Sequence, residues 1–198
     1  SLPDRLVQPG ALAGTLQPSA RELLVLAMTD VSPWAKNRTL RGSSMRLIFM
    51  GSPEPVIAPL ETLRNQCAEH GHELIAVVSQ PARPVGRRGD LTDPPVASFA
   101  KKAGLKVLQP EKASDPEFLA ELRNLAPDVI ITAAYGQILT PEFLAIPRRG
   151  TINVHPSLLP RYRGAIPVPA ALMDGEEISG VTILFTVQKL DCLLYTSD

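Results

Sequence analysis

The feature that most constrains the fold is a series of short apolar segments that recur along the chain with amphipathic segments between them. The clearest is 128–134, which reads Asp-Val-Ile-Ile-Thr-Ala-Ala, and 46–50, 73–79, 150–155 and 180–187 are similar. Short apolar runs bounded by turn-forming residues are typical of buried strands. Strands that are apolar on both faces occur in parallel sheets covered by helices on each side.

Helix-like segments alternate with these predicted strands, at 55–69, 95–103, 114–124 and 166–173. The alternation predicts an α/β fold, a Rossmann-like and mostly parallel sheet with helices on both faces. A further short strand is expected at 106–108, and 80–93, rich in Pro, Gly and Arg, is expected to be a loop. Because such sheets bind ligands at the carboxyl ends of their strands, the loops that follow the strands are the candidate functional segments.

Charge and cysteine content exclude several classes of protein. Twenty Lys and Arg balance twenty Asp and Glu, so a globally basic nucleic-acid binder is excluded and any nucleic acid must bind a local patch. Cys67 and Cys192 form neither a metal-binding spacing nor a disulfide framework, which favours a reducing cytoplasm. No apolar run approaches the roughly 18 residues of a membrane span, so no membrane partner is expected.

The segment 150–155 carries two polar residues at alternate positions. Asn153 and His155 point to the same face of a strand, and Pro156 then ends the ladder, which places His155 at the carboxyl end. Buried polar groups need a partner or a function. Taken alone, the Asn-x-His pattern favours a structural pair, a hydrogen-bonded histidine beside a hydrogen-bonding asparagine.

Several motifs surround this pair in a fixed order. They are Gly51-Ser52-Pro53, Gln80-Pro-Ala-Arg83-Pro84-Val-Gly86-Arg87, Ala134-Tyr135-Gly136-Gln-Ile-Leu139, Asn153-Val-His155-Pro-Ser157-Leu-Leu-Pro160, Gly180-Val-Thr-Ile183 and Leu190-Asp191. In order and spacing they resemble the methionyl-tRNA formyltransferase family over residues 45–191. The Asn-Val-His-x-Ser-Leu-Leu-Pro run indicates formyltetrahydrofolate-dependent transferases, and the Gln-Pro-x-Arg-Pro-x-Gly-Arg loop indicates the tRNA enzymes among them.

The resemblance implies a catalytic trio of Asn153, His155 and Asp191. When an amine attacks a formyl carbon, an amide donor and an imidazole stabilise the developing oxyanion. An imidazole with an ordinary pKa of about 6.5 also transfers the proton of the amine. A nearby carboxylate would orient the ring and favour its protonated form. Without the resemblance, Asp191 is a strand-end aspartate in a turn.

The resemblance also implies the substrates, 10-formyltetrahydrofolate and initiator methionyl-tRNA, with no metal. The predicted folate-binding residues are Ser157, Leu158, Leu159 and Pro160 on one wall and Tyr135, Gly136, Gln137, Ile138 and Leu139 on the other. The tRNA acceptor end is expected at Arg83, Arg87 and Arg88. The family commonly has lysines after this point, whereas this chain has Arg88-Gly89-Asp90, which weakens the electrostatic argument. Gly51-Ser52-Pro53 is no Gly-x-Gly-x-x-Gly motif, so a nicotinamide cofactor is not expected.

Three regions are expected along the chain. Residues 45–191 form the catalytic domain, truncated so that the sheet is incomplete at its carboxyl-terminal end. Residues 1–44 show no periodicity and are expected to be a disordered or artefactual extension, and 192–198 resemble a translated sequencing-library adapter. The family interpretation includes a cytoplasmic monomer, and the truncated chain itself is expected to be inactive. The alternatives are a related formyltransferase acting on glycinamide ribonucleotide or an amino sugar nucleotide, and an inactive folate-binding module.

Overall fold

A six-stranded sheet forms the centre of the computed structural model, which describes residues 44–86, 89–164 and 166–186. The strand order is β5 (Val107–Leu108), β2 (Glu73–Val78), β1 (Arg46–Met50), β6 (Val129–Thr132), β7 (Thr151–His155) and β8 (Thr182–Thr186). The first five strands are parallel and β8 is antiparallel to β7. The predicted α/β fold with a mostly parallel sheet is therefore confirmed.

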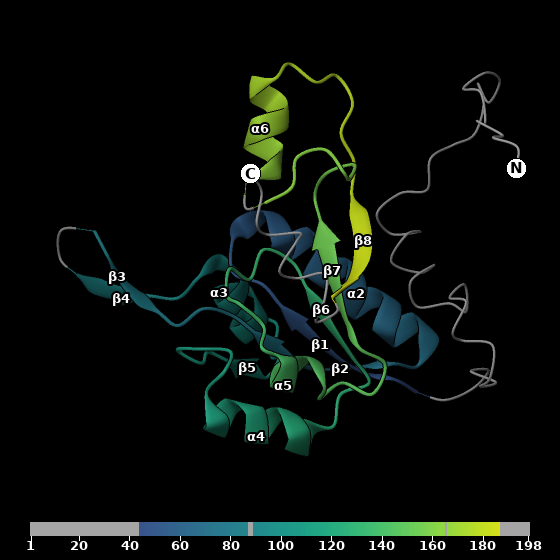
Figure 1. Ribbon diagram of the computed structural model, residues 1–198. Helices are drawn as coiled ribbons and strands as arrows, with labels where there is room; N and C mark the ends of the chain where they lie inside the picture. The colour runs from purple at the N-terminus through teal and green to yellow at the C-terminus, as the bar shows by residue number, and fades with distance from the viewer. Residues whose placement is uncertain (1–43, 87–88, 165, 187–198) are drawn as a thin grey trace, which may run out of the picture.

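Two apolar layers cover the sheet. Leu47 and Phe49 of β1 pack with residues of α2 (Ile57–His70) and α3 (Pro95–Lys102). Ile48 and Met50, on the opposite face of the same strand, pack with α4 (Pro116–Leu125) and α5 (Pro141–Leu144). This alternation follows from the two-residue period of a strand, and it explains why β1 is apolar at every position after Arg46. Figure 1 shows α2 and α4 on opposite sides of the sheet.

The helices begin and end near the predicted positions, with local differences. The first predicted helix is divided into a 3-10 turn, η1 (Glu54–Val56), and α2, which ends at the left-handed Gly71 (φ 70°). Asp115 precedes α4 as expected, but its carboxylate accepts a hydrogen bond from the Lys112 amide and does not cap the helix. The last helix is α6 (Pro167–Met173).

Two elements depart from the expectation of a plain loop. The segment 80–93 contains an antiparallel hairpin of β3 (Arg83–Val85) and β4 (Asp90–Thr92), which projects from the body of the molecule in Figure 1. The short helix α5 follows β6, and the Thr140 hydroxyl caps it by accepting from the Phe143 amide. Both elements are too short for hydrophobic periodicity to reveal them.

The amino edge of the sheet is held by a buried carboxylate. Asp128, directly before β6, accepts a hydrogen bond from the Arg46 amide at 2.8 Å and forms an ion pair with Arg148 at 2.8 Å. His72 lies at this edge as well, where its Nδ1 accepts from the Met45 amide. Charged groups at this edge therefore have structural partners.

Some expectations fall outside the described residues. They include the predicted extension 1–44, apart from Ser44, and the predicted tail 192–198. In the part of the chain that the structure describes, no helix combines the length and apolar character needed to cross a bilayer.

Candidate active site

The strand order locates the candidate site. From β1 the chain moves to β2 and β5 on one side, and then returns to β6 and β7 on the other, so the order reverses between β1 and β6. In sheets of this kind ligands bind outside the carboxyl ends of the strands at such a reversal. The loops after β1, β6 and β7 meet at this edge of the sheet (Figure 1).

Gly51 allows the first two of these loops to come together. A Cβ added at Gly51 would lie 2.7 Å from the Ala133 carbonyl oxygen and 2.9 Å from both Phe49 Cε1 and Val56 Cγ2. Real Cβ atoms essentially never approach so closely. A glycine is required here because the backbone after β1 packs directly against the backbone after β6.

Asn153 occupies the third position of β7, beside Thr132 of β6. The Thr132 hydroxyl lies 2.9 Å from Asn153 Oδ1 and 3.2 Å from the Ile152 carbonyl oxygen. In this arrangement Oδ1 faces β6, and the Nδ2 donor lies at the other end of the planar amide. The predicted oxyanion role of Asn153 would use this Nδ2.

His155 ends β7 on the same face as Asn153 and is buried. Its Nε2 lies 2.9 Å from the Tyr162 carbonyl oxygen, which only accepts, so Nε2 carries a hydrogen and donates it. In the neutral ring, Nδ1 is then the nitrogen with a free lone pair. The predicted proton transfer at His155 would therefore use Nδ1.

The turn that receives the His155 hydrogen bond has its own support. Tyr162 is in the left-handed region (φ 55°), its hydroxyl donates to Glu176 at 2.9 Å, and Arg161 pairs with the same carboxylate. The Arg161 guanidinium also lies over the Tyr162 ring, 5.1 Å from its centroid. Partial desolvation and the hydrogen bond to Glu176 raise the pKa of Tyr162 to about 12, and that same bond lowers the pKa of Glu176.

The segment 157–160 is held by side chains of the sheet and of the segment itself. The Thr182 hydroxyl donates to the Ser157 carbonyl at 2.7 Å and accepts from the Leu159 amide at 3.2 Å. The Ser157 hydroxyl donates to the Arg161 carbonyl at 2.9 Å. The hydroxyl of Ser157, a predicted folate-binding residue, therefore has a partner within its own loop. Leu158 is partly exposed and packs against Gly180, where a Cβ would overlap it.

The loop after β6 contains the other predicted folate-binding residues. Ala134 and Gly136 are both left-handed (φ 45° and 80°), which turns Tyr135 inward and leaves Ile138 89% exposed. The Tyr135 hydroxyl is buried without a hydrogen-bond partner among the described residues, and burial raises the pKa of this phenol above its usual value. Leu139 packs against the buried cluster beneath the loop.

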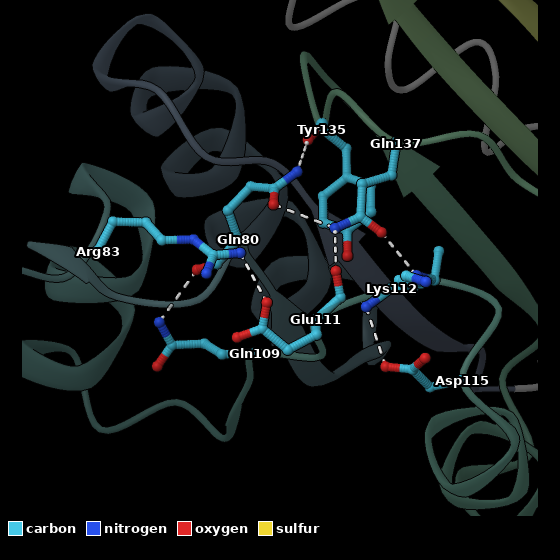
Figure 2. Close-up of polar contacts among 9 residues, drawn as sticks. Gln80, Arg83, Gln109, Glu111, Lys112, Asp115, Tyr135 and Gln137 are labelled. Atoms are coloured by element: carbon cyan, nitrogen blue, oxygen red, sulfur yellow. Dashed lines mark hydrogen bonds and ion pairs between the residues drawn. The ribbon is translucent and has the colours of Figure 1, made fainter.

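Gln137 lies in the same loop, and its side chain is used internally. Figure 2 shows it between Gln80, which follows β2, and the segment containing Glu111 and Lys112. Its Nε2 donates to Gln80 Oε1 and to the Glu111 carbonyl, each at 3.1 Å. A contact between Gln137 and folate would therefore use its backbone.

The predicted tRNA-binding residues are described in part. Arg83 begins β3 and forms an exposed ion pair with Glu111 at 2.6 Å. Every residue of β3 and β4 is exposed, so the hairpin offers two flanks to a large partner. Arg87 and Arg88 lie outside the described residues, as does Asp191, the third member of the predicted trio.

Sequence reasoning missed the residues that hold the site together: Thr132, Thr182, Gln80 and Tyr162. Thr132 and Thr182 are polar positions within apolar strands, and this is a signal that could have identified them. Gln80 and Tyr162 belong to quoted motifs, but their partners are distant in the sequence. Among the described residues, no group of three His, Cys, Asp or Glu side chains comes close enough to hold a metal ion.

Comparison with known proteins agrees with this arrangement. A family model described as formyl transferase matches residues 45–192. The methionyl-tRNA formyltransferase of Ruminiclostridium cellulolyticum is 49% identical over 147 residues, which are 74% of this chain and 46% of that protein. Its counterpart from Staphylococcus aureus strain JH1 is 51% identical over 146 residues, 74% of this chain and 45% of that protein. The chain thus spans about half the length of these curated relatives.

Solved structures support the fold. A glycinamide ribonucleotide transformylase from Symbiobacterium toebii superposes with a TM-score of 0.59 at 22% identity, over 76% of this chain and 70% of that one. At this identity the likeness establishes the architecture alone.

Proposed function

Because the chain belongs to the formyl transferase family, we propose that residues 45–191 transfer a formyl group from 10-formyltetrahydrofolate to the amino group of methionyl-initiator tRNA. The observation that carries the proposal is the placement of Asn153 and His155 on one face of β7 at the carboxyl edge of the sheet. The choice of acceptor is supported by the identity of about 50% to relatives named as methionyl-tRNA formyltransferases.

The residues at the edge fit a folate. A flat ring system needs apolar surface together with backbone groups that recognise its edge. Ile138 and Leu158 supply exposed apolar side chains from two loops at this edge, and the backbone of the 133–139 loop contains two left-handed residues. When bound, 10-formyltetrahydrofolate supplies an activated formyl carbon.

Asn153 and His155 of β7, together with Asp191, would then perform three tasks. The Nδ2 of Asn153, oriented by Thr132, donates to the oxygen that gains negative charge as the amine adds to the formyl carbon. Nδ1 of His155 accepts a proton from the attacking amine and delivers it to the departing nitrogen, so the ring ends as it began. We assign Asp191 the role of stabilising the imidazolium that exists between these transfers.

The hairpin β3–β4 is the proposed contact for the tRNA acceptor end. It is exposed on both strands and carries Arg83 at its base, with Arg87 and Arg88 in the connection. Arginine forms bidentate bonds to phosphate and stacks on unpaired bases, which suits a single-stranded acceptor end. The proposed function also includes that the protein acts as a monomer in a reducing cytoplasm.

A chimera tests the proposal in the context of a full-length relative. The 147 aligned residues of this chain replace those of the Ruminiclostridium cellulolyticum protein, and formyl transfer to methionyl-tRNA and to glycinamide ribonucleotide is measured. Transfer to methionyl-tRNA is expected, and His155→Ala should abolish it while leaving tetrahydrofolate binding nearly unchanged. Transfer to glycinamide ribonucleotide in place of methionyl-tRNA, or full turnover in His155→Ala, would contradict the proposal.

A further inference from the structure

Gln80 is the centre of a hydrogen-bond network that joins three loops of the carboxyl edge (Figure 2). Its Nε2 donates to the Tyr135 carbonyl at 2.9 Å, and its Oε1 accepts from Gln137 Nε2 at 3.1 Å. Its backbone amide donates to Ser52 Oγ at 3.0 Å, and its carbonyl accepts from Gln109 Nε2 at 3.1 Å. The side chain therefore reaches the loop after β6, while the backbone is tied to the loops after β1 and β5.

The side chain of Gln137 completes the network from the opposite side. Its Nε2 has two hydrogens, and both are donated, one to Gln80 Oε1 and one to the Glu111 carbonyl. Its Oε1 accepts from the Ala113 amide at 2.6 Å. An amide group with all of these bonds made has one preferred orientation, so Gln137 is fixed in place.

The loop that these two glutamines hold has a backbone that requires support. Ala134 is left-handed (φ 45°), a conformation that costs free energy for any residue with a Cβ, and Gly136 is left-handed two residues later. Backbone of this kind persists where surrounding contacts over-determine it, and such residues cluster at ligand sites. The contact from Gln80 falls on the carbonyl of Tyr135, the residue between the two left-handed positions.

We propose that Gln80 and Gln137 are positioning residues that hold the 133–139 loop in the shape that binds the formyl donor. The inference rests on the proposed function of that loop as a wall of the folate site. Neither side chain is assigned a contact with the donor. Their effect is exerted through the backbone of Tyr135 and its neighbours, which would present fixed groups to the flat ring.

Gln109 provides a matched control in the same network. Its Nε2 bonds the Gln80 carbonyl and Asp93 Oδ1, so its replacement removes comparable hydrogen bonds, and neither of these bonds reaches the 133–139 loop. A general effect of removing a half-buried amide would appear equally in Gln80→Leu and Gln109→Leu. A positioning effect would appear in the first variant alone.

Two measurements on this chain test the proposal: tetrahydrofolate affinity by calorimetry, and amide hydrogen exchange of the 133–139 loop without ligand. Each net hydrogen bond changes an equilibrium by roughly three- to tenfold, so Gln80→Leu should weaken tetrahydrofolate binding about tenfold. Loop exchange should accelerate by a similar factor. Gln109→Leu should change both by less than about twofold. The effect of the Gln80→Leu/Gln137→Leu double variant should be smaller than the product of the two single effects, since both single variants remove the one bond that the glutamines share.

Gln80→Glu covers the case in which Gln80→Leu does not fold. It keeps the size and the acceptor for Gln137 but places a carboxylate oxygen against the Tyr135 carbonyl, and it should also accelerate exchange of the loop. If the unsubstituted chain binds tetrahydrofolate and the Gln80 variants match it in affinity and in exchange, the inference is overturned and the proposed function stands. If the unsubstituted chain fails to bind tetrahydrofolate, the proposed function is contradicted. Faster amide exchange of the 133–139 loop in the Gln80 variants alone would still support the inference that Gln80 holds this loop in place.

Discussion

Replacing Gly51 by alanine should destabilise the protein and disturb the site at the same time. The added Cβ would lie 2.7 Å from the Ala133 carbonyl oxygen, a backbone atom that no side-chain rotation can move. It would also lie 2.9 Å from Phe49 Cε1, within a fully buried ring. Overpacking of this kind costs about 1–3 kcal/mol, and we expect Gly51→Ala to lie near the middle of that range, at about 2 kcal/mol.

Urea unfolding followed by far-ultraviolet circular dichroism measures this effect. With a slope of about 2 kcal/mol per molar urea, a loss of about 2 kcal/mol lowers the unfolding midpoint by about 1 M. Gly71→Ala is the control: a Cβ there meets nothing within 4 Å, so the cost is confined to left-handed strain of about 1 kcal/mol.

The same clash should weaken tetrahydrofolate binding, because it pushes apart the loops after β1 and β6. A midpoint for Gly51→Ala equal to that of the unsubstituted chain would refute the close approach of these two loops. An unfolding midpoint for Gly51→Ala no lower than that of Gly71→Ala would refute the expected size of the destabilisation.

Three further predictions concern groups that hold the sheet and its loops. Asp128→Ala should lose about 2 kcal/mol of unfolding free energy because the Arg46 amide loses a charged acceptor, whereas Asp128→Asn should lose clearly less; equal losses in chemical denaturation would argue against this bond. The pKa of His72 is lowered, first by burial and then by electrostatic interaction with His70 and Arg149, so its stabilising effect is complete above about pH 6.5 and is lost as pH falls through the lowered value. The urea midpoint should fall accordingly between pH 7.5 and 5, and a slope unchanged in His72→Gln would contradict this. Thr182→Val should cost about 1–2 kcal/mol and accelerate amide exchange after Ser157, since the carbonyl and amide that the hydroxyl bridges lose their partner; unchanged exchange would count against the bridge.

The strands were predictable because each carries its own signal. Val129–Thr132 and Arg46–Met50 are apolar on both faces, and only a sheet covered on both sides buries such residues. The pairing of Asn153 and His155 on one face follows from the same two-residue period. The order of the strands has no comparable local signal, because it depends on which edges meet after the helices have packed.

The contacts that shape the candidate site could not be predicted in the same way. Gln80 reaches Tyr135 and Gln137 across 55 and 57 residues of sequence, and no periodicity links them. The hydrogen bond from the Ser157 hydroxyl to the Arg161 carbonyl, four residues away, was not predicted either. A short polar side chain in a loop takes the nearest acceptor, and the fold determines which acceptor that is.

The hairpin β3–β4 illustrates a third limit. Its strands are three residues each and wholly exposed, so neither burial nor alternation distinguishes them from a loop. The Pro, Gly and Arg content of the segment nevertheless predicted that it lies at the surface, and Arg83 is exposed in the structure. The residue types thus predicted the exposure of this segment, whereas its hairpin conformation depends on pairing between β3 and β4.

The central claim is that the carboxyl edge of the sheet, between the loops after β6 and β7, is the formyl-donor site. Amide hydrogen exchange of this chain with and without saturating tetrahydrofolate tests it most directly. The account predicts slower exchange confined to 133–139 and 155–160, with the amino edge around Asp128 unchanged. Binding without protection of these two segments, or protection centred on the amino edge, would contradict it.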